Sequence, residues 1–143
     1  MTPQTELEIA LRLVVAAFLG ALIGAEREYT RHPAGLRTMS AVALGSALFS
    51  AIGLLEPHSD PTRVAAQVVT GVGFLGAGAI LRSGPSIRGL TTAATIWVAA
   101  GIGMASGFGH FILASVTALL VLLVLIVLRR LEVILTGLDP EHE

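Results

Sequence analysis

Five long apolar runs, separated by short polar breaks, constrain this chain more than any other feature of its sequence. The runs are 7–24, 38–55, 64–81, 90–107 and 110–128. At a rise of about 1.5 Å per residue, a helix of about 18 residues spans about 27 Å, close to the roughly 30 Å hydrocarbon thickness of a bilayer. The pattern therefore predicts an all-α polytopic membrane bundle of about five transmembrane helices.

The low charge content supports a membrane environment. Charged residues make up 13% of the 143 residues, whereas soluble domains carry about 25%. A soluble helical bundle is the alternative, but its helices would each show a polar face, and these runs are apolar all round. The length allows one domain, so we expect a single transmembrane domain over 1–143, with 129–143 as a short cytoplasmic tail.

The arginines gather in alternate breaks between the runs and thereby predict an orientation. Seven of the nine lie in 25–37, in 82–89 and at 129–130, whereas Arg12 and Arg63 would lie on the other side. Cytoplasmic loops carry an excess of basic residues. We therefore expect the N-terminus outside and the C-terminus in the cytoplasm.

Glycines lie inside the apolar runs, where we expect them to serve helix packing. Close approach at small residues helps decide helix association in lipid, because no hydrophobic force acts between the helices there. We therefore expect the third and fourth runs to form the packed centre, the bulky fifth run to face lipid, and small-residue faces to form a homodimer. The packing glycines are Gly20, Gly24, Gly71, Gly73, Gly76, Gly78, Gly101, Gly103 and Gly107.

Several chemistries find no support in the sequence. Cysteine is absent, which excludes disulfides and thiolate sites, and the net charge of −1 gives no reason to expect nucleic acid. The segment 71–76 is formally GxGxxG, but a dinucleotide site needs a preceding strand and a βαβ unit. No zinc-protease, nucleophile–His or P-loop motif occurs, so we expect no enzyme activity, no cofactor and no metal site.

Charged residues at the cytoplasmic ends of the helices form the first candidate site. One interpretation is a structural clasp, in which topology-setting charges pair at the interface. The other is a basic pocket for an anionic headgroup or an acidic partner, because a guanidinium group grips phosphate or carboxylate with two hydrogen bonds. The residues are Glu26, Arg27, Arg37, Arg82 and Arg88.

A second polar group lies inside the third and fourth runs: Gln67, Thr70, Thr91, Thr92 and Thr95. Their hydroxyl groups could bond back to the preceding turn, join helices, or line a polar cavity. Mg²⁺ usually binds to proteins through carboxylates, but no acidic residue lies within the last four runs. These runs therefore give little support for a Mg²⁺ pathway. Near the other membrane face, Glu8 and Arg12 are spaced for an i, i+4 ion pair.

Four ordered motifs together resemble the MgtC/SapB family. They are GAERE at 24–28, PAGLRT at 33–38, TGVGFLGAGAILR at 70–82 and GLTTAATIW at 89–97, and the match runs from about residue 7 to 128. The resemblance implies a bacterial inner-membrane protein with five helices and a cytoplasmic C-terminus. It also implies a link to growth in low Mg²⁺ and a role as a regulator of other membrane proteins, including the ATP synthase and ion pumps.

The chain departs from this family in two respects. The virulence-associated branch has an acidic residue in place of Ser83, Asn in place of Thr91 and Cys in place of Val98, so the resemblance does not by itself extend to the virulence role. Many members have an ACT-like domain after the fifth helix, whereas only 129–143 follow here. We expect a non-enzymatic regulator linked to Mg²⁺ limitation, membrane potential or stress adaptation; the alternative is a small Mg²⁺-related ion transporter or channel.

Overall fold

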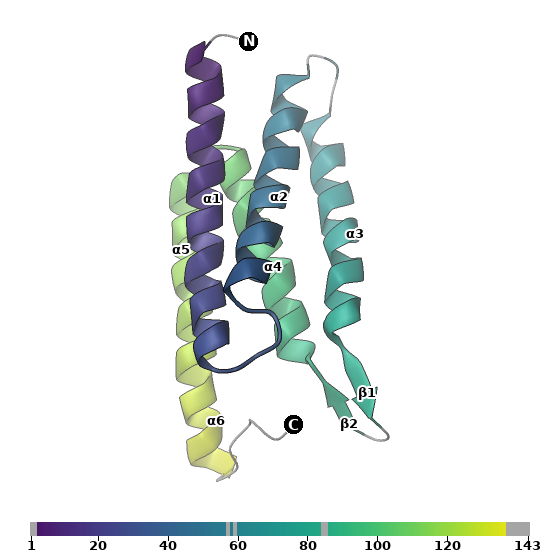
Figure 1. Ribbon diagram of the computed structural model, residues 1–143, viewed down its shortest axis with the longest axis vertical. Coiled ribbons are helices and arrows are strands. Elements are labelled where there is room, and N and C mark those ends of the chain that lie inside the picture. Colours follow the sequence, from purple (N-terminus) through teal and green to yellow (C-terminus); the bar gives the residue numbers. More distant parts are fainter. Residues whose placement is uncertain (1–2, 57, 59, 84–85, 137–143) are drawn as a thin grey trace.

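The chain folds as a bundle of helices that run along one common long axis (Figure 1). The computed structural model describes residues 3–56, 58, 60–83 and 86–136. The prediction of an all-α membrane bundle is confirmed. The helices are α1 (Pro3–Tyr29), α2 (Leu36–Leu55), α3 (Pro61–Ala79), α4 (Leu90–Gly107) and α5 (Phe111–Leu123), which continues through the π-helical segment η1 (Val124–Leu128) into α6 (Arg129–Thr136).

The bundle belongs in a membrane. Four helical stretches of the described chain are long and apolar enough to cross one: Thr5–Tyr29, Leu36–Leu55, Leu90–Gly107 and Phe111–Leu135. The helix α3 has 19 residues but is less apolar, because Arg63, Gln67 and Thr70 interrupt it. It lies beside α2 and α4 in the same bundle (Figure 1). Length and composition therefore make four helices candidate spans, and the crossing of α3 stays a prediction.

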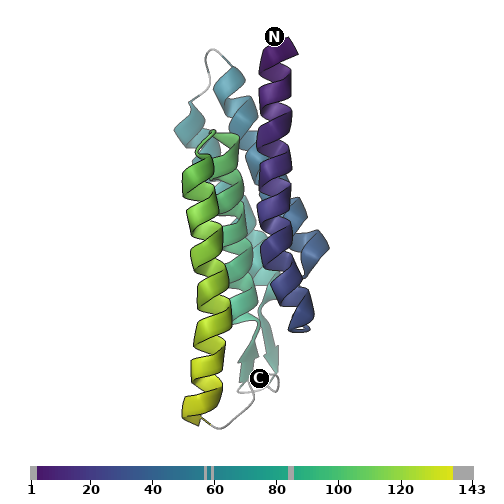
Figure 2. The ribbon, with the colours of Figure 1, turned by 90° about the vertical axis from the view of Figure 1, so that its left-hand side faces the viewer.

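Several element boundaries differ from the sequence expectation. The first run was expected over 7–24, but α1 extends from Pro3 to Tyr29. The third run was expected to reach Leu81, but α3 ends at Ala79, and β1 (Leu81–Ser83) pairs antiparallel with β2 (Ser86–Arg88). The fifth run was expected to end at residue 128, but the helix continues to Thr136, as Figure 2 shows. The first residues of the expected tail are therefore helical, and 137–143 lie outside the described residues.

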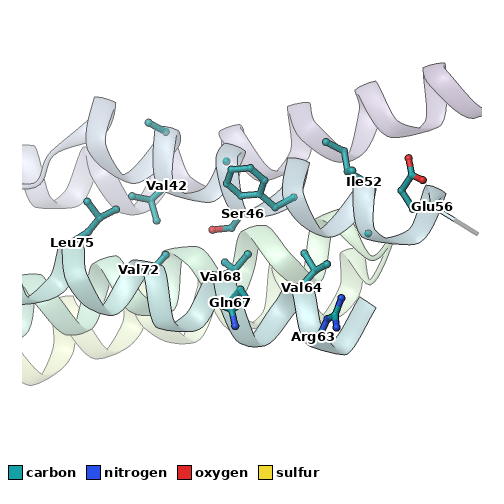
Figure 3. Close-up of a pocket in the computed structure, with 15 residues that line it drawn as sticks. Val42, Ser46, Ile52, Glu56, Arg63, Val64, Gln67, Val68, Val72 and Leu75 are labelled. Carbon is teal, nitrogen blue, oxygen red and sulfur yellow. The ribbon is translucent and has the colours of Figure 1, made fainter. Parts of the chain in front are cut away.

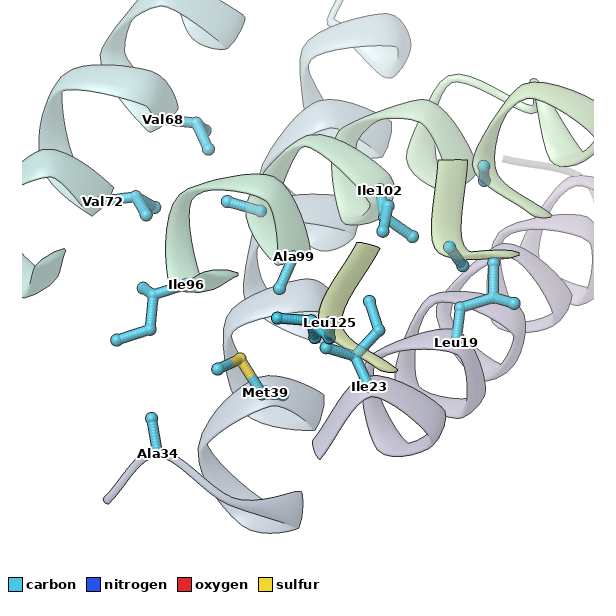
Figure 4. Close-up of a cluster of buried hydrophobic side chains, with 13 residues drawn as sticks. Leu19, Ile23, Ala34, Met39, Val68, Val72, Ile96, Ala99, Ile102 and Leu125 are labelled. Carbon is cyan, nitrogen blue, oxygen red and sulfur yellow. The ribbon is translucent and has the colours of Figure 1, made fainter. Parts of the chain in front are cut away.

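The helix α4 lies at the centre of the bundle. It buries nine residues, more than any other helix of the described chain, and Figure 4 shows its side chains meeting those of the surrounding helices. The largest fully buried side chains include Ile23 of α1, Met39 of α2 and Ile102 of α4. In contrast, α5 buries only Ala114 and Ala118, so the prediction that the fifth run lies on the outside is confirmed.

Glycine permits the close approach of α1, α2 and α4. A Cβ atom added at Gly103 would collide with the carbonyl oxygen of Ala43, and one at Gly107 with that of Ala47. A Cβ at Gly20 would lie 2.6 Å from the carbonyl oxygen of Met39. At these positions the backbones of neighbouring helices touch directly, as expected for small residues in membrane bundles.

The prediction that the third and fourth runs form the packed centre holds for α4 but only in part for α3. Val68, Val72 and Gly76 of α3 are buried, but its other glycines behave differently from those of α4. A Cβ atom at Gly71, Gly73 or Gly78 would meet no atom within 4 Å, and only Gly76 approaches α4, at 3.5 Å from the carbonyl oxygen of Ala93. Gly101 of α4 is equally open. The partner of α4 at the centre is α2, whose alanines and serines sequence reasoning passed over.

The start of α3 is fixed by a side-chain cap. The backbone N–H of Thr62 donates to Asp60 Oδ1 at 2.9 Å, and the Thr62 hydroxyl donates to the same oxygen at 2.7 Å. These hydrogen bonds favour the carboxylate, so they hold the pKa of Asp60 below its usual value. Proline at the first helical position, Pro61, completes a standard helix start.

Candidate functional site

Most arginines lie at one end of the bundle. The end of α1, the start of α2, the β1–β2 hairpin and α6 all lie there (Figure 1). The start of α1 and the connections α2–α3 and α4–α5 lie at the opposite end (Figures 1 and 2). The structure thus brings the residues of the first candidate site to the same end, and their individual environments decide what each can do.

Glu26 and Arg27 form a buried pair. The Arg27 side chain is 3% exposed, and its Nη1 lies 3.7 Å from Glu26 Oε2. Within the described chain, Arg27 Nε and Nη2 and Glu26 Oε2 have no hydrogen-bond partner. A cation this deeply buried depends on its counter-charge, because removing one member of a buried pair is strongly destabilising. The geometry favours the structural clasp for these two residues and places them away from any surface ligand.

Arg37 lies instead in a small polar pocket on the α1–α2 connection. The pocket has a volume of about 290 Å³. Glu28 Oε2 accepts a hydrogen bond from the Leu36 backbone N–H at 3.0 Å, which ties the connection to α1. Arg37 is exposed, so its charge is available to an anion. The pocket is lined by Glu28, Arg31, His32, Pro33, Gly35, Leu36, Arg37 and Thr38.

Arg82 and Arg88 lie on the hairpin. Cross-strand pairing places Arg82 opposite Ile87 and Arg88 opposite Leu81, and both arginines are exposed. Neither lines the pocket that contains Arg37. The predicted single basic pocket is therefore divided into a buried clasp, a pocket on the α1–α2 connection and a separate pair on the hairpin.

The polar residues inside the third and fourth runs do not share one surface. Thr92 and Thr95 are buried in the bundle, whereas Gln67, Thr70 and Thr91 are exposed. The Thr70 hydroxyl donates to the Ala66 carbonyl at 3.0 Å, and the Thr95 hydroxyl donates to the Thr91 carbonyl at 2.7 Å. Each hydroxyl group is therefore bonded to the preceding turn of its own helix, rather than joining two helices or lining a polar cavity.

At the opposite end, Arg12 links two helices. It pairs with Glu8, as its spacing predicts, and Nη1 also donates to the Gly107 carbonyl at 2.9 Å. A cation at the last carbonyls of a helix is favoured by the helix dipole. The Glu8–Arg12 prediction is confirmed, and the bond to the end of α4 adds a role in holding α1 against it. Across the described ranges, no group of three His, Asp or Glu residues is placed to hold a metal ion.

A groove between α2 and α3 was missed by sequence reasoning. Its volume is about 820 Å³, and Glu56 and Arg63 lie at one end of it (Figure 3). Its signal in the sequence was the small residues of two successive runs, which leave space where the helices face each other. It is lined by Ala41, Val42, Gly45, Ser46, Phe49, Ile52, Gly53, Glu56, Arg63, Val64, Gln67, Val68, Gly71, Val72 and Leu75.

The outward face of α3 is the second unpredicted surface. Ala66, Thr70, Gly73, Phe74 and Ala77 recur at helical spacing and are all exposed, with Phe74 82% exposed. The exposed face of α5 is built from bulky Leu, Ile and Val side chains, whereas this face is small apart from Phe74. Small residues on an exposed face permit a further helix to approach closely.

Comparison with known proteins identifies the family. The sequence profile of the MgtC family matches residues 13–134. This chain belongs to the MgtC family. The chain is 49% identical over 120 residues to Protein MgtC of Salmonella typhimurium (strain LT2), covering 84% of this chain and 52% of that protein.

Two further relatives show how far the similarity extends. The chain is 46% identical over 124 residues to Protein MgtC of Brucella abortus (strain 2308), covering 86% of this chain and 52% of that protein. It is 45% identical over 136 residues to an uncharacterized protein of Synechocystis sp., covering 94% of this chain and 58% of that protein. The chain thus spans about half the length of the MgtC proteins that it matches. No solved structure matches the chain.

Proposed function

We propose that this MgtC-family chain is a non-enzymatic regulator that binds other membrane proteins through the outward face of α3. The observation that carries the proposal is the openness of that face. A side chain added at Gly73 would meet nothing within 4 Å, and the neighbouring Phe74 is almost fully exposed. A partner helix can therefore approach without any rearrangement of the bundle.

The setting of this activity is part of the proposal. We place the chain in the bacterial inner membrane, with the arginine-rich end in the cytoplasm, because basic loops remain on that side. We further propose that it acts under Mg²⁺ limitation, in keeping with the family resemblance. Ion transport is the rival function. It receives less support, because Glu26, Glu28 and Glu56 lie at helix ends and no carboxylate lies within α2, α4 or α5.

Gly73→Leu tests the proposed surface. The new side chain would occupy the face where a partner helix must approach, so we expect the amount of partner captured from native membranes at low Mg²⁺ to fall about tenfold, equivalent to about 1.4 kcal/mol. The control is Gly71→Leu, the same change two residues away, which lies in the groove and should leave capture unchanged. Equal capture by both variants and the parent chain would contradict the proposal.

Flux measurements separate the regulator from the transporter. The purified chain in liposomes is expected to move Mg²⁺ no faster than empty vesicles do, as reported by an entrapped Mg²⁺-sensitive dye. Selective Mg²⁺ entry above that baseline would favour transport, and loss of this entry in Gln67→Leu would assign the route to the α3 side of the bundle.

A further inference from the structure

The groove between α2 and α3 opens on the side of the bundle. Phe49 and Ile52 of α2 and Leu75 of α3 line it and are also about half exposed, at 57%, 45% and 52%. Its floor includes Val68 and Val72, which are buried. In a membrane such a groove faces the hydrocarbon layer along most of its length.

The chemistry of the lining selects a hydrocarbon occupant. Most lining residues are Val, Ile, Leu, Phe, Ala or Gly, and water needs two to four polar partners to occupy a cavity stably. An unfilled groove would deprive its lining of dispersion contacts. The bilayer places lipid acyl chains directly at the opening of the groove, so we expect these acyl chains to occupy it.

The groove is too narrow to enclose a whole helix. The α2 residues from Ala41 to Glu56 span about 22 Å along the axis, so a volume of about 820 Å³ corresponds to a mean cross-section of about 37 Å². A helix with side chains is about 10–12 Å in diameter and needs more than twice that area. An extended hydrocarbon chain, with its neighbours at about 4 Å, needs about 20 Å², so the groove matches one or two acyl chains.

Two opposite charges mark one end of the groove. Glu56 directly follows the end of α2, and Arg63 lies in the first turn of α3 (Figure 3). In the described chain neither side chain forms an ion pair within 4 Å, although the charge of Arg63 does act on the carboxylate of Asp60. Because α2 is long and apolar enough to span a membrane, we expect its end at the depth of the lipid headgroups. The nearby Asp60 carboxylate accepts the hydrogen bonds of Thr62, which leaves Glu56 as the acidic group of the groove itself.

We propose that this groove binds one phospholipid with an ammonium-bearing zwitterionic headgroup, such as phosphatidylethanolamine. The acyl chains lie along Gly45 and Gly71, where the structure leaves open space. Arg63 binds the phosphate, because guanidinium forms strong charge-assisted hydrogen bonds with phosphate oxygens. Glu56 accepts hydrogen bonds from the ammonium group. The inference goes beyond the proposed regulatory function and does not depend on it.

Native mass spectrometry of the purified chain, released from nanodiscs with equal amounts of phosphatidylethanolamine and phosphatidylglycerol, tests the proposal. We expect one phosphatidylethanolamine retained per chain, at about tenfold preference over phosphatidylglycerol, equivalent to about 1.4 kcal/mol. Glu56→Gln should remove the preference, since phosphatidylglycerol lacks the ammonium group. Arg63→Gln should lower retention of both lipids about tenfold.

Gly71→Leu is the decisive variant, because its side chain fills the groove. We expect retained lipid to fall about tenfold, whereas the matched change Gly73→Leu, outside the groove, leaves retention within about twofold of the parent. Circular dichroism checks that each variant keeps its helices, and Gly45→Leu fills the groove from the other wall if Gly71→Leu does not fold. Lipid retention unchanged in both groove variants would overturn the proposal. A mass corresponding to two copies of the protein, present for the parent and absent for Gly71→Leu, would also overturn it, because a second copy would then be the occupant of the groove.

Discussion

Gly103→Ala is expected to destabilise the bundle by roughly 3 kcal/mol. Overpacking a well-filled interior typically costs about 1–3 kcal/mol. The upper end applies here, because the added methyl group would collide with a backbone carbonyl, that of Ala43, rather than with a movable side chain. To remove this collision, α2 and α4 must move apart where their backbones lie closest together.

Unfolding by sodium dodecyl sulfate in mixed micelles, followed by circular dichroism, measures this loss. Gly101→Ala is the matched control, since it makes the same change two residues earlier in the same helix. No atom lies within 4 Å of the Cβ that it adds. We expect its unfolding curve to match that of the parent chain or to shift slightly toward stability, because Ala favours helix over Gly. Equal destabilisation by the two variants would refute the packing of α2 against α4.

Glu26→Gln is expected to destabilise the chain by about 3 kcal/mol. Removing one partner of a buried ion pair typically costs about 3–5 kcal/mol, and Arg27 would be left as a cation with 3% of its side chain exposed. The lower end of the range applies, because the two groups lie 3.7 Å apart rather than in direct hydrogen-bond contact.

A double variant distinguishes the lost charge from lost packing. In Glu26→Gln with Arg27→Met both charges are gone and much of the side-chain volume remains. The same micelle unfolding should therefore show a smaller loss than Glu26→Gln alone. Glu28→Gln is the control, because Glu28 is exposed and an amide oxygen can still accept the Leu36 N–H. If Glu26→Gln unfolds within about 0.5 kcal/mol of the parent chain, the clasp does not stabilise this end of the bundle.

The helices themselves could be predicted from the sequence, because a bilayer leaves few alternatives. Apolar runs of span length must satisfy their backbone hydrogen bonds internally, so 38–55 and 90–107 become helices almost as expected. The extension of the last helix to Thr136 was missed, since Arg129 and Arg130 read as the end of a span. The hairpin was missed because three-residue strands carry no periodicity.

The packing partners of each helix were harder to predict. Glycine spacing shows which face of a helix carries small residues, but not which helix packs against that face. Gly103 and Gly71 look alike in the sequence, yet one touches a backbone and the other faces an open groove. The best contact of α4 is with Ala43 and Ala47 of α2, and alanine is too common in apolar runs to indicate packing.

The charged candidate site shows the same limit. The motifs at 24–28 and 33–38 correctly indicated one end of the bundle. Local geometry then separated Arg27, which is buried, from Arg37, which is exposed. No spacing rule distinguishes these two arginines, because burial here is set by how α1 ends against its neighbours.

Photo-crosslinking in native membranes tests the central claim that the outward face of α3 binds another membrane protein. A photoreactive amino acid replaces Phe74 in one variant and Ile112 of α5 in the other, two side chains that are 82% and 83% exposed. We expect a discrete protein adduct from position 74 at low Mg²⁺ and only lipid adducts from position 112. Lipid adducts alone at position 74, or adducts only between two copies of this chain, would contradict the claim.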